Sequence, residues 1–256
     1  TFPSRETKSV LVRGRIGNAT GQSRTNLLSI RIGNEDGNNL VAPRVAVWTA
    51  KGITVNTSLP ATSTNMVISA REQDFEMVIR PTNAITTWSE WGAGIQHAMS
   101  VELGTQPEWP GTLRFAPVTF RDFKTSGQEF TINGRPTHLR GTHHGGDFPL
   151  TGYPPCDVEY WRKLFQTCKE WGLNHVRFHS FCPPEAAFTA ADEIGIYLQI
   201  EPGMWNEISP GTPMEQMLYE ETERMIKYYG NHPSFALFSA SNEAKGRWKE
   251  ACSKWV

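Results

Sequence analysis

The stretch Asn231-His-Pro-Ser-Phe-Ala-Leu-Phe-Ser-Ala-Ser-Asn-Glu243 decides the fold of the second half of this chain. A turn around Pro233 leads into a short apolar run, which is typical of a buried strand in a parallel sheet. The run ends on the polar dipeptide Asn242-Glu243. Because α/β enzymes place their catalytic groups at the C-terminal ends of such strands, we expect Glu243 to be a functional carboxylate.

The sequence from residue 124 to 256 alternates strand and helix patterns. An Asn133-Gly134 turn predicts a hairpin at its start. Predicted strands span 137–141, 175–179, 197–201 and 235–240, and predicted helices span 157–171, 184–194 and 214–229, with another from 247. The third helix is expected to bury Met217, Leu218, Met225 and Ile226. Such crossovers imply a parallel sheet, and four strand–helix units are half of a TIM (β/α)8 barrel.

Residues 1–123 follow a different, all-β pattern. Val10 and Val12 alternate with Arg13 and Arg15, as in a half-buried strand. Similar patterns recur at 28–32, 45–47 and 75–80, separated by clusters of Gly, Pro and Asn. Short strands with this spacing predict an immunoglobulin-like β-sandwich with a structural role.

The composition excludes several classes of partner. With 38% hydrophobic residues, 20% charged residues and a net charge of -1, the chain is expected to be globular and to bind neither nucleic acid nor a membrane surface. No apolar run approaches the roughly 20 residues of a membrane span. The four Cys lack metal-ligand spacing, and no GxGxxG, P-loop, GxSxG or HExxH motif occurs. The sequence therefore predicts no cofactor.

Several segments together resemble glycoside hydrolase family 2, which includes β-galactosidases, β-glucuronidases and β-mannosidases. They are Asn231-His-Pro-Ser234, Asn242-Glu243, Phe120-Arg-Asp-Phe123, Phe130-Thr-Ile-Asn-Gly-Arg-Pro136 and Asn174-His-Val-Arg177. The resemblance implies a retaining, exo-acting β-glycosidase with a carbohydrate substrate. Glu243 would be its general acid/base, and Asn242 would contact the 2-hydroxyl of the sugar. The segments 88–91 and 99–103 would be the last strands of the sandwich.

Further residues are candidates for sugar binding. Alternation places Arg177 and His179 on one strand face. If that face points into the barrel, both reach the catalytic end; a buried His179 bonded to a backbone carbonyl is the alternative. Many family members carry a His shortly after the first-strand Gly, where this chain has Gly145, so we expect His143 or His144 to substitute. His179 also lies two residues after the Arg, whereas the family usually has three. Both departures touch sugar-binding positions, so the resemblance does not transfer the substrate class.

Glu201 and Trp205 leave alternatives open. Glu201 ends the third predicted strand, and we expect it to contact sugar or support the site, although a catalytic pair of Glu201 and Glu243 is an alternative. Trp205 is a candidate sugar-stacking platform, with loop packing as the alternative. Some family members bind Mg²⁺ or Na⁺ near the acid/base, but the sequence supports no such ion separately. A metal site from His143, His144 and Glu201 is a minor alternative.

The resemblance also implies that these residues are an excerpt. The family's nucleophile lies on strand seven, so the 256 residues are expected to lack it and to be inactive alone. Thr1–Arg5 has no signal-peptide character and reads as an internal cut; the compartment stays open, with export favoured. Half a barrel would expose strand edges, so self-association is expected. The alternative function is a non-catalytic carbohydrate-binding or assembly module on the same scaffold.

Overall fold

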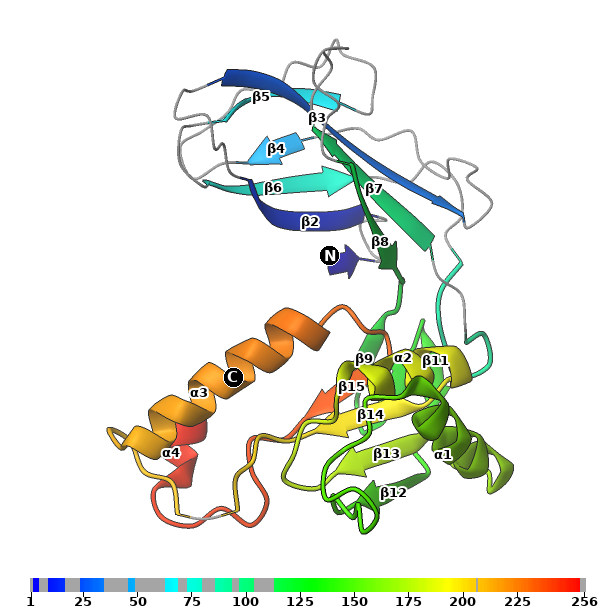
Figure 1. Cartoon of the computed structure of the whole chain (residues 1–256), viewed down its shortest axis with the longest axis vertical. Coiled ribbons are helices and arrows are strands. Elements are labelled where there is room, and N and C mark those ends of the chain that lie inside the picture. The colour runs from blue at the N-terminus through cyan, green and yellow to red at the C-terminus, as the bar shows by residue number, and fades with distance from the viewer. Residues whose placement is uncertain are drawn as a thin grey trace. The chain divides into compact units, whose positions relative to one another are not determined.

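The computed structural model describes residues 2–4, 9–16, 24–34, 46–48, 63–68, 73–79, 86–93, 97–103, 113–205 and 207–253 (Figure 1). The chain divides into two compact units. The first contains residues 1–87 and 95–122, and the second contains residues 88–94 and 123–256.

The first unit contains two four-stranded antiparallel sheets, ordered β1-β2-β6-β4 and β5-β3-β7-β8. Their strands are β1 (Phe2–Ser4), β2 (Ser9–Ile16), β3 (Arg24–Asn34), β4 (Ala46–Trp48), β5 (Ser63–Ile68), β6 (Gln73–Ile79), β7 (His97–Leu103) and β8 (Leu113–Val118). In β2, Val10 and Val12 are buried, while Arg13 and Arg15 are exposed and form ion pairs with carboxylates of β6. The predicted alternation in this strand is confirmed. Val45 and Arg80, at the ends of two predicted patterns, lie outside the described residues.

The second unit combines a small antiparallel sheet with a four-stranded parallel sheet. The antiparallel sheet contains β9 (Phe123–Ser126), β10 (Glu129–Ile132) and β11 (Arg135–Thr137). The parallel sheet contains, in sequential order, β12 (Gly141–His144), β13 (His175–Phe178), β14 (Tyr197–Ile200) and β15 (Phe235–Phe238). The helices that follow these strands in turn are α1 (Val158–Glu170), α2 (Glu185–Ile194), α3 (Pro213–Tyr229) and α4 (Trp248–Cys252) (Figure 1).

Helices α1 to α3 cover one face of the parallel sheet. Asp157 caps α1 by accepting hydrogen bonds from two backbone N–H groups of its first turn. Side chains of α1, α2 and α3 pack against Val176, Phe178, Leu198 and Ile200 of the central strands. Since side chains alternate along a strand, the residues between these four project from the opposite face. No helix among the described residues has both the length and the apolar character needed to cross a membrane.

The opposite face is closed at the N-terminal end of the strands by a second cluster. The predicted hairpin is present, with Asn133 and Gly134 at φ 52° and 78°, as a two-residue turn requires. Ile132 of this hairpin packs with Trp88 and Tyr197. This floor restricts the exposed part of the face to the C-terminal ends of the strands.

The segment around Trp88 belongs to the second unit, although the sequence placed it among the strands of the first half. The Trp88 indole N–H donates to the carbonyl of Asp192 at 2.8 Å, and Asn133 Nδ2 donates to the Trp88 carbonyl at 2.9 Å. Lys169 Nζ donates to the carbonyl of Glu90 at 2.9 Å. These contacts join residues 45 or more positions apart, which no local pattern reports.

Gly195 gives a test of how firmly this segment is docked. It ends α2 at φ 85°, and an added Cβ would lie 2.8 Å from the Glu90 carbonyl oxygen. We expect Gly195→Ala to lower the free energy of unfolding by about 3 kcal/mol, from the left-handed backbone and the clash together. Gly172→Ala is the matched control, because Gly172 has φ 76° with open space around it, and should cost about 1 kcal/mol. Equal losses in urea unfolding would contradict the docking.

Two sequence predictions need correction. The first parallel strand is Gly141–His144, not 137–141, because Asn174 holds residues 138–140 as a separate connection through bonds to Arg140 N–H and the His138 carbonyl. In α3, Leu218 and Met225 are buried, but Met217 and Ile226 are exposed. Glu215 and Thr222 complete the buried stripe instead, since side-chain hydrogen bonds satisfy both of them.

Candidate active site

A row of polar side chains lines the uncovered face of the parallel sheet near its C-terminal edge. His143, Arg177 and Gln199 are aligned in register on β12, β13 and β14. His179 and Glu201 come two residues further along their chains and continue the same face. Three successive strands thus direct polar groups to one edge of the sheet. The loops after β14 and β15 add Trp205, Asn242 and Glu243.

Arg177 joins the site through a buried charge network. Its Nε donates to Glu201 Oε1 at 2.7 Å, and its Nη2 donates to Asn242 Oδ1 at 2.8 Å. The second oxygen of Glu201 accepts the Ser180 backbone N–H at 2.8 Å, and the Glu201 side chain is 0% exposed. Ser180 has φ 58°, an uncommon backbone conformation for this residue type. Both Glu201 oxygens are therefore committed inside the protein.

Glu243, unlike the buried Glu201, lies at the surface. Its side chain is exposed, and its backbone has φ 48° just after the end of β15. Strained non-glycine conformations of this kind cluster at functional sites. The preceding residue fixes the turn, because the Asn242 backbone N–H donates to the Met204 carbonyl at 3.3 Å. The carboxylate accepts a hydrogen bond from the Trp205 indole N–H at 3.2 Å.

Aromatic rings form the wall beside this carboxylate. The His179 ring meets the Trp205 ring edge to face, with centroids 5.3 Å apart. The His143 ring lies 6.2 Å from the His179 ring. Such rings present apolar faces on which a sugar ring can stack, and imidazole nitrogens that can bond hydroxyls.

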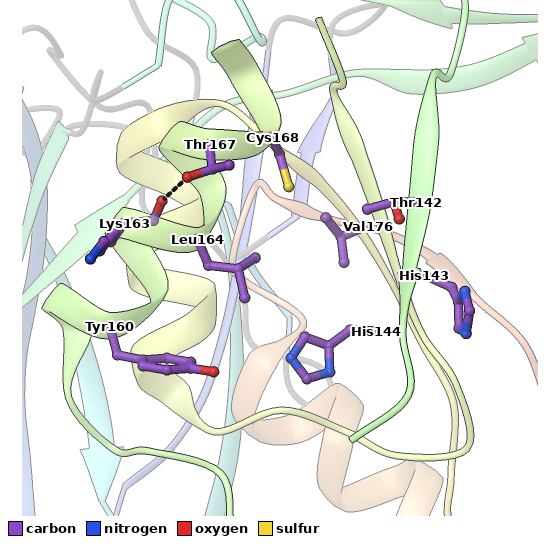
Figure 2. A pocket seen from close by; sticks show the side chains of 9 residues that line it. All are labelled: Thr142, His143, His144, Tyr160, Lys163, Leu164, Thr167, Cys168 and Val176. Carbon is purple, nitrogen blue, oxygen red and sulfur yellow. Dashed lines mark hydrogen bonds between the residues drawn. The ribbon is translucent and has the colours of Figure 1, made fainter. Parts of the chain in front are cut away.

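The structure separates His144 from these residues and corrects its expected role. Figure 2 shows the His143 and His144 side chains on opposite sides of β12. His144 packs against Phe148, Trp161 and Phe178 on the helix-covered side. Burial lowers the pKa of its ring, whose Nδ1 accepts the Gly146 N–H at 3.1 Å. The register of β12, which differs from the predicted strand, decides which His faces the site.

The geometry also gives no support to the alternative metal site from His143, His144 and Glu201. His143 and His144 diverge, and Glu201 is bonded to Arg177 and Ser180. Within the described ranges, no three His, Cys, Asp or Glu side chains come together as a metal site would require.

His232, in the motif before β15, belongs to a structural hydrogen-bond network and not to the candidate active site. Its Nδ1 lies 2.7 Å from Asp192 Oδ2, and its Nε2 lies 2.9 Å from Glu185 Oε1. Asp192 also accepts the Ser234 backbone N–H at 3.0 Å. Burial lowers the pKa of His232, but hydrogen bonds and charges from the two carboxylates outweigh it, so the net pKa is raised. This network connects α2 to the turn that precedes β15, the strand that leads to Glu243.

The raised pKa of His232 predicts a pH-dependent contribution to stability. The imidazolium is favoured in the folded state, so its stabilisation is complete below the unfolded value of about 6.5 and is lost as pH rises through the higher folded value. Urea unfolding of the wild type and His232→Gln should therefore differ most near pH 6 and least near pH 9. A difference that grows with pH would contradict this assignment.

The structure thus brings together six of the seven predicted site residues: Glu243, Asn242, Arg177, His179, Glu201 and Trp205. It places His143, which the sequence offered as the alternative to His144, on the same face, and it adds the Ser180 backbone N–H and Gln199. Alternation along residues 197–201 could have identified Gln199, because it shares the face of Glu201. The Ser180 contact has no signal in the sequence. An exposed carboxyl group beside an amide and an aromatic wall can exchange a proton with a bound polar ligand.

Comparisons with known proteins point to one family. Residues 123–254 match the family model described as glycosyl hydrolases family 2, TIM barrel domain. A putative β-glucuronidase of Formosa agariphila is 32% identical over 133 residues, covering 49% of this chain and 15% of that protein. A β-galactosidase of Bacteroides ovatus is 26% identical over 141 residues, covering 53% and 16%. The chain thus spans about one sixth of the length of these relatives.

Solved structures share the fold over nearly the whole chain. A family 2 β-galacturonidase from Eisenbergiella tayi, bound to galacturonate, has a TM-score of 0.74 at 18% identity, covering 99% of this chain and 41% of its own. A β-glucuronidase of Bacteroides uniformis has a TM-score of 0.71 at 22% identity, covering 92% and 26%. These identities support the fold alone, whereas the family model matches more than half of the residues. The chain belongs to glycoside hydrolase family 2.

Proposed function

We propose that this chain carries the acid/base half of the active site of a retaining, exo-acting β-glycosidase, resembling β-galactosidases, that removes terminal non-reducing sugars from oligo- or polysaccharides. The observation that carries the proposal is the exposed Glu243 carboxyl group, which follows the fourth parallel strand of a family 2 barrel segment. The β-glucuronidase and β-galactosidase names of the relatives support the reaction class.

Glu243 would serve both chemical steps. In the first step, a carboxylate nucleophile attacks the anomeric carbon, the glycosidic C–O bond breaks, and Glu243 gives its proton to the leaving oxygen. In the second, Glu243 takes a proton from water, whose oxygen attacks the anomeric carbon and releases the nucleophile. Both steps need a carboxyl group that the substrate can reach, which the exposure of Glu243 provides.

Asn242 and the residues around it would bind the sugar. Arg177 occupies Oδ1 of Asn242 and thereby orients the amide, so its Nδ2 donors can meet the 2-hydroxyl. His179 and Trp205 would contact the ring from one side. The carbohydrate is the only partner that these groups suggest.

Glu201 is a poor candidate for the nucleophile. A nucleophile must touch the anomeric carbon, but Glu201 is fully buried and both of its oxygens accept internal hydrogen bonds. We therefore assign it to holding Arg177 and place the nucleophile outside these residues. Four parallel strands are described here, whereas a closed barrel has eight.

Trapping the covalent intermediate tests this division. An activated 2-deoxy-2-fluoro-β-glycoside, incubated with the natural polypeptide that carries these residues, should leave its sugar on a Glu outside these 256 residues. Peptide mass spectrometry locates the label. A label on Glu201 would instead establish Glu201 and Glu243 as the catalytic pair. Sugar binding without labelling or turnover would support the non-catalytic binding module.

The outer strands predict how the 256-residue chain behaves alone. β12 and β15 each pair with one strand within the described part of the sheet. A hollow of about 520 Å³ also opens between β12 and α1, bordered by apolar side chains such as Leu164 and Val176 (Figure 2). Unpaired edges and apolar hollows favour association, so light scattering should detect oligomers. A monodisperse monomer would contradict this expectation.

A further inference from the structure

The contact between Trp205 and Glu243 has a chemical consequence beyond sugar stacking. The indole Nε1–H is only a donor, so Glu243 Oε2, 3.2 Å away, must act as its acceptor. When Glu243 is protonated, its proton then belongs on Oε1. We propose that Trp205 is a positioning residue that assigns the transferable proton of Glu243 to Oε1, an inference that rests on the acid/base role of Glu243.

The loops that carry the two residues are fastened together on both sides of the contact. The Met204 carbonyl accepts hydrogen bonds from Asn242 N–H at 3.3 Å and Ser241 Oγ at 3.3 Å. Further along, Ile208 N–H donates to the Lys245 carbonyl at 3.1 Å. Met204 and Ile208 are each 1% exposed, so buried anchors flank the exposed Trp205. The indole position is therefore fixed by backbone bonds and packing.

The indole ring is also supported from the side. The His179 ring meets it at 87° with centroids 5.3 Å apart. The His179 backbone N–H donates to the His144 carbonyl at 3.0 Å, which fixes the start of the loop after β13. Trp205 is thus held between the His179 ring and the carboxyl group of Glu243.

A fixed acceptor role for Oε2 suits both steps of the reaction. In the first step, the O–H bond at Oε1 breaks as the proton moves to the leaving oxygen. In the second, Oε1 takes a proton from water, the hydroxyl oxygen forms the new bond to the anomeric carbon, and the bond from that carbon to the nucleophile breaks. Since the leaving oxygen and the water oxygen occupy the same side of the sugar in a retaining enzyme, one oxygen of Glu243 serves both.

The kinetic test replaces Trp205 by Phe, which keeps an aromatic ring and removes the N–H. In the natural polypeptide, kcat/KM for glycosides with poor leaving groups should fall about tenfold, because their departure needs the proton. For 2,4-dinitrophenyl glycosides, which leave without protonation, the change should stay within about twofold. Trp171→Phe, at an exposed indole beside the C-terminal end of α1, is the control and should change neither.

The outcomes distinguish the acid/base role of Glu243 from the positioning role of Trp205. Equal losses for both substrate types in Trp205→Phe would reduce Trp205 to a stacking surface and overturn the inference. Glu243→Gln, assayed in parallel, tests the proposed function itself. If it shows no leaving-group dependence, the acid/base assignment fails; if it does and Trp205→Phe does not, only the inference fails.

A spectroscopic readout uses the natural polypeptide with ¹⁵N-labelled tryptophan. The indole ¹H–¹⁵N resonance of Trp205, assigned by its loss in Trp205→Phe, should move with pH as Glu243 titrates. In Glu243→Gln that movement should vanish. A Trp205 resonance with the same pH response in both proteins would show that the contact is absent and overturn the inference.

Discussion

Glu243→Gln is expected to lower kcat/KM for aryl β-glycosides with poor leaving groups by about 10³-fold in the natural polypeptide. The amide has nearly the same shape and can still accept the Trp205 N–H, but it cannot give or take the proton. The measurement is steady-state turnover over a series of aryl leaving groups. Glu223→Gln, on the exposed side of α3, is the matched control and should leave turnover unchanged.

Rescue by a small anion distinguishes an acid/base from other roles. In Glu243→Ala, azide should enter the space of the lost side chain and attack the glycosyl-enzyme from the side that water normally uses. The product would be a β-glycosyl azide, because this second displacement restores the original configuration. An α-glycosyl azide would show that Glu243 is the nucleophile, and no rescue would leave the acid/base role without support.

Arg177→Met is expected to have the largest effect on stability. The substitution leaves the fully buried Glu201 with the hydrogen bond from the Ser180 backbone N–H and removes the bond to Asn242. Removing one member of a buried ion pair typically costs about 3–5 kcal/mol, because the other charge stays buried without compensation. Urea unfolding should show a loss in that range, and the double variant Arg177→Met with Glu201→Gln should recover much of it.

Arg162 provides a matched control for this prediction. Its side chain is 29% exposed, close to the 32% of Arg177, but its partners Glu159 and Glu193 are 73% and 37% exposed. Solvent screens such pairs, so Arg162→Met should cost about 1 kcal/mol or less. Similar losses for both arginines would mean that the burial of Glu201 does not set the cost.

Much of the second unit could be predicted from the sequence because its signals are local. The Asp157 cap, the Asn133-Gly134 turn and the apolar stripe of α1 each depend on residues within one or two turns of the chain. The strand–helix order and the position of Glu243 after the fourth strand follow from the same kind of signal. The immunoglobulin-like character of the first unit stays a prediction.

The sequence-based predictions were wrong where residues distant in the sequence determine the local structure. The start of β12 depends on Asn174, more than 30 residues away, which bonds the chain before the strand. That shift decides that His143 faces the site and His144 the helices. Likewise, the buried face of α3 differs from the predicted one because Glu215 and Thr222 form hydrogen bonds inside the unit. A hydrophobic pattern cannot predict those bonds.

The sequence by itself determined the kind of protein: alternating strands and helices, a carboxylate at the end of the fourth strand, and the motifs of one hydrolase family. These features are local, and each depends on a few residues that are close in the sequence. Only the tertiary structure decided how the carboxylates divide their work. Glu201 is buried and accepts hydrogen bonds from Arg177 and Ser180. Glu243 is exposed, and one of its oxygens accepts a hydrogen bond from Trp205. Burial and long-range hydrogen bonds exist only once the chain has folded.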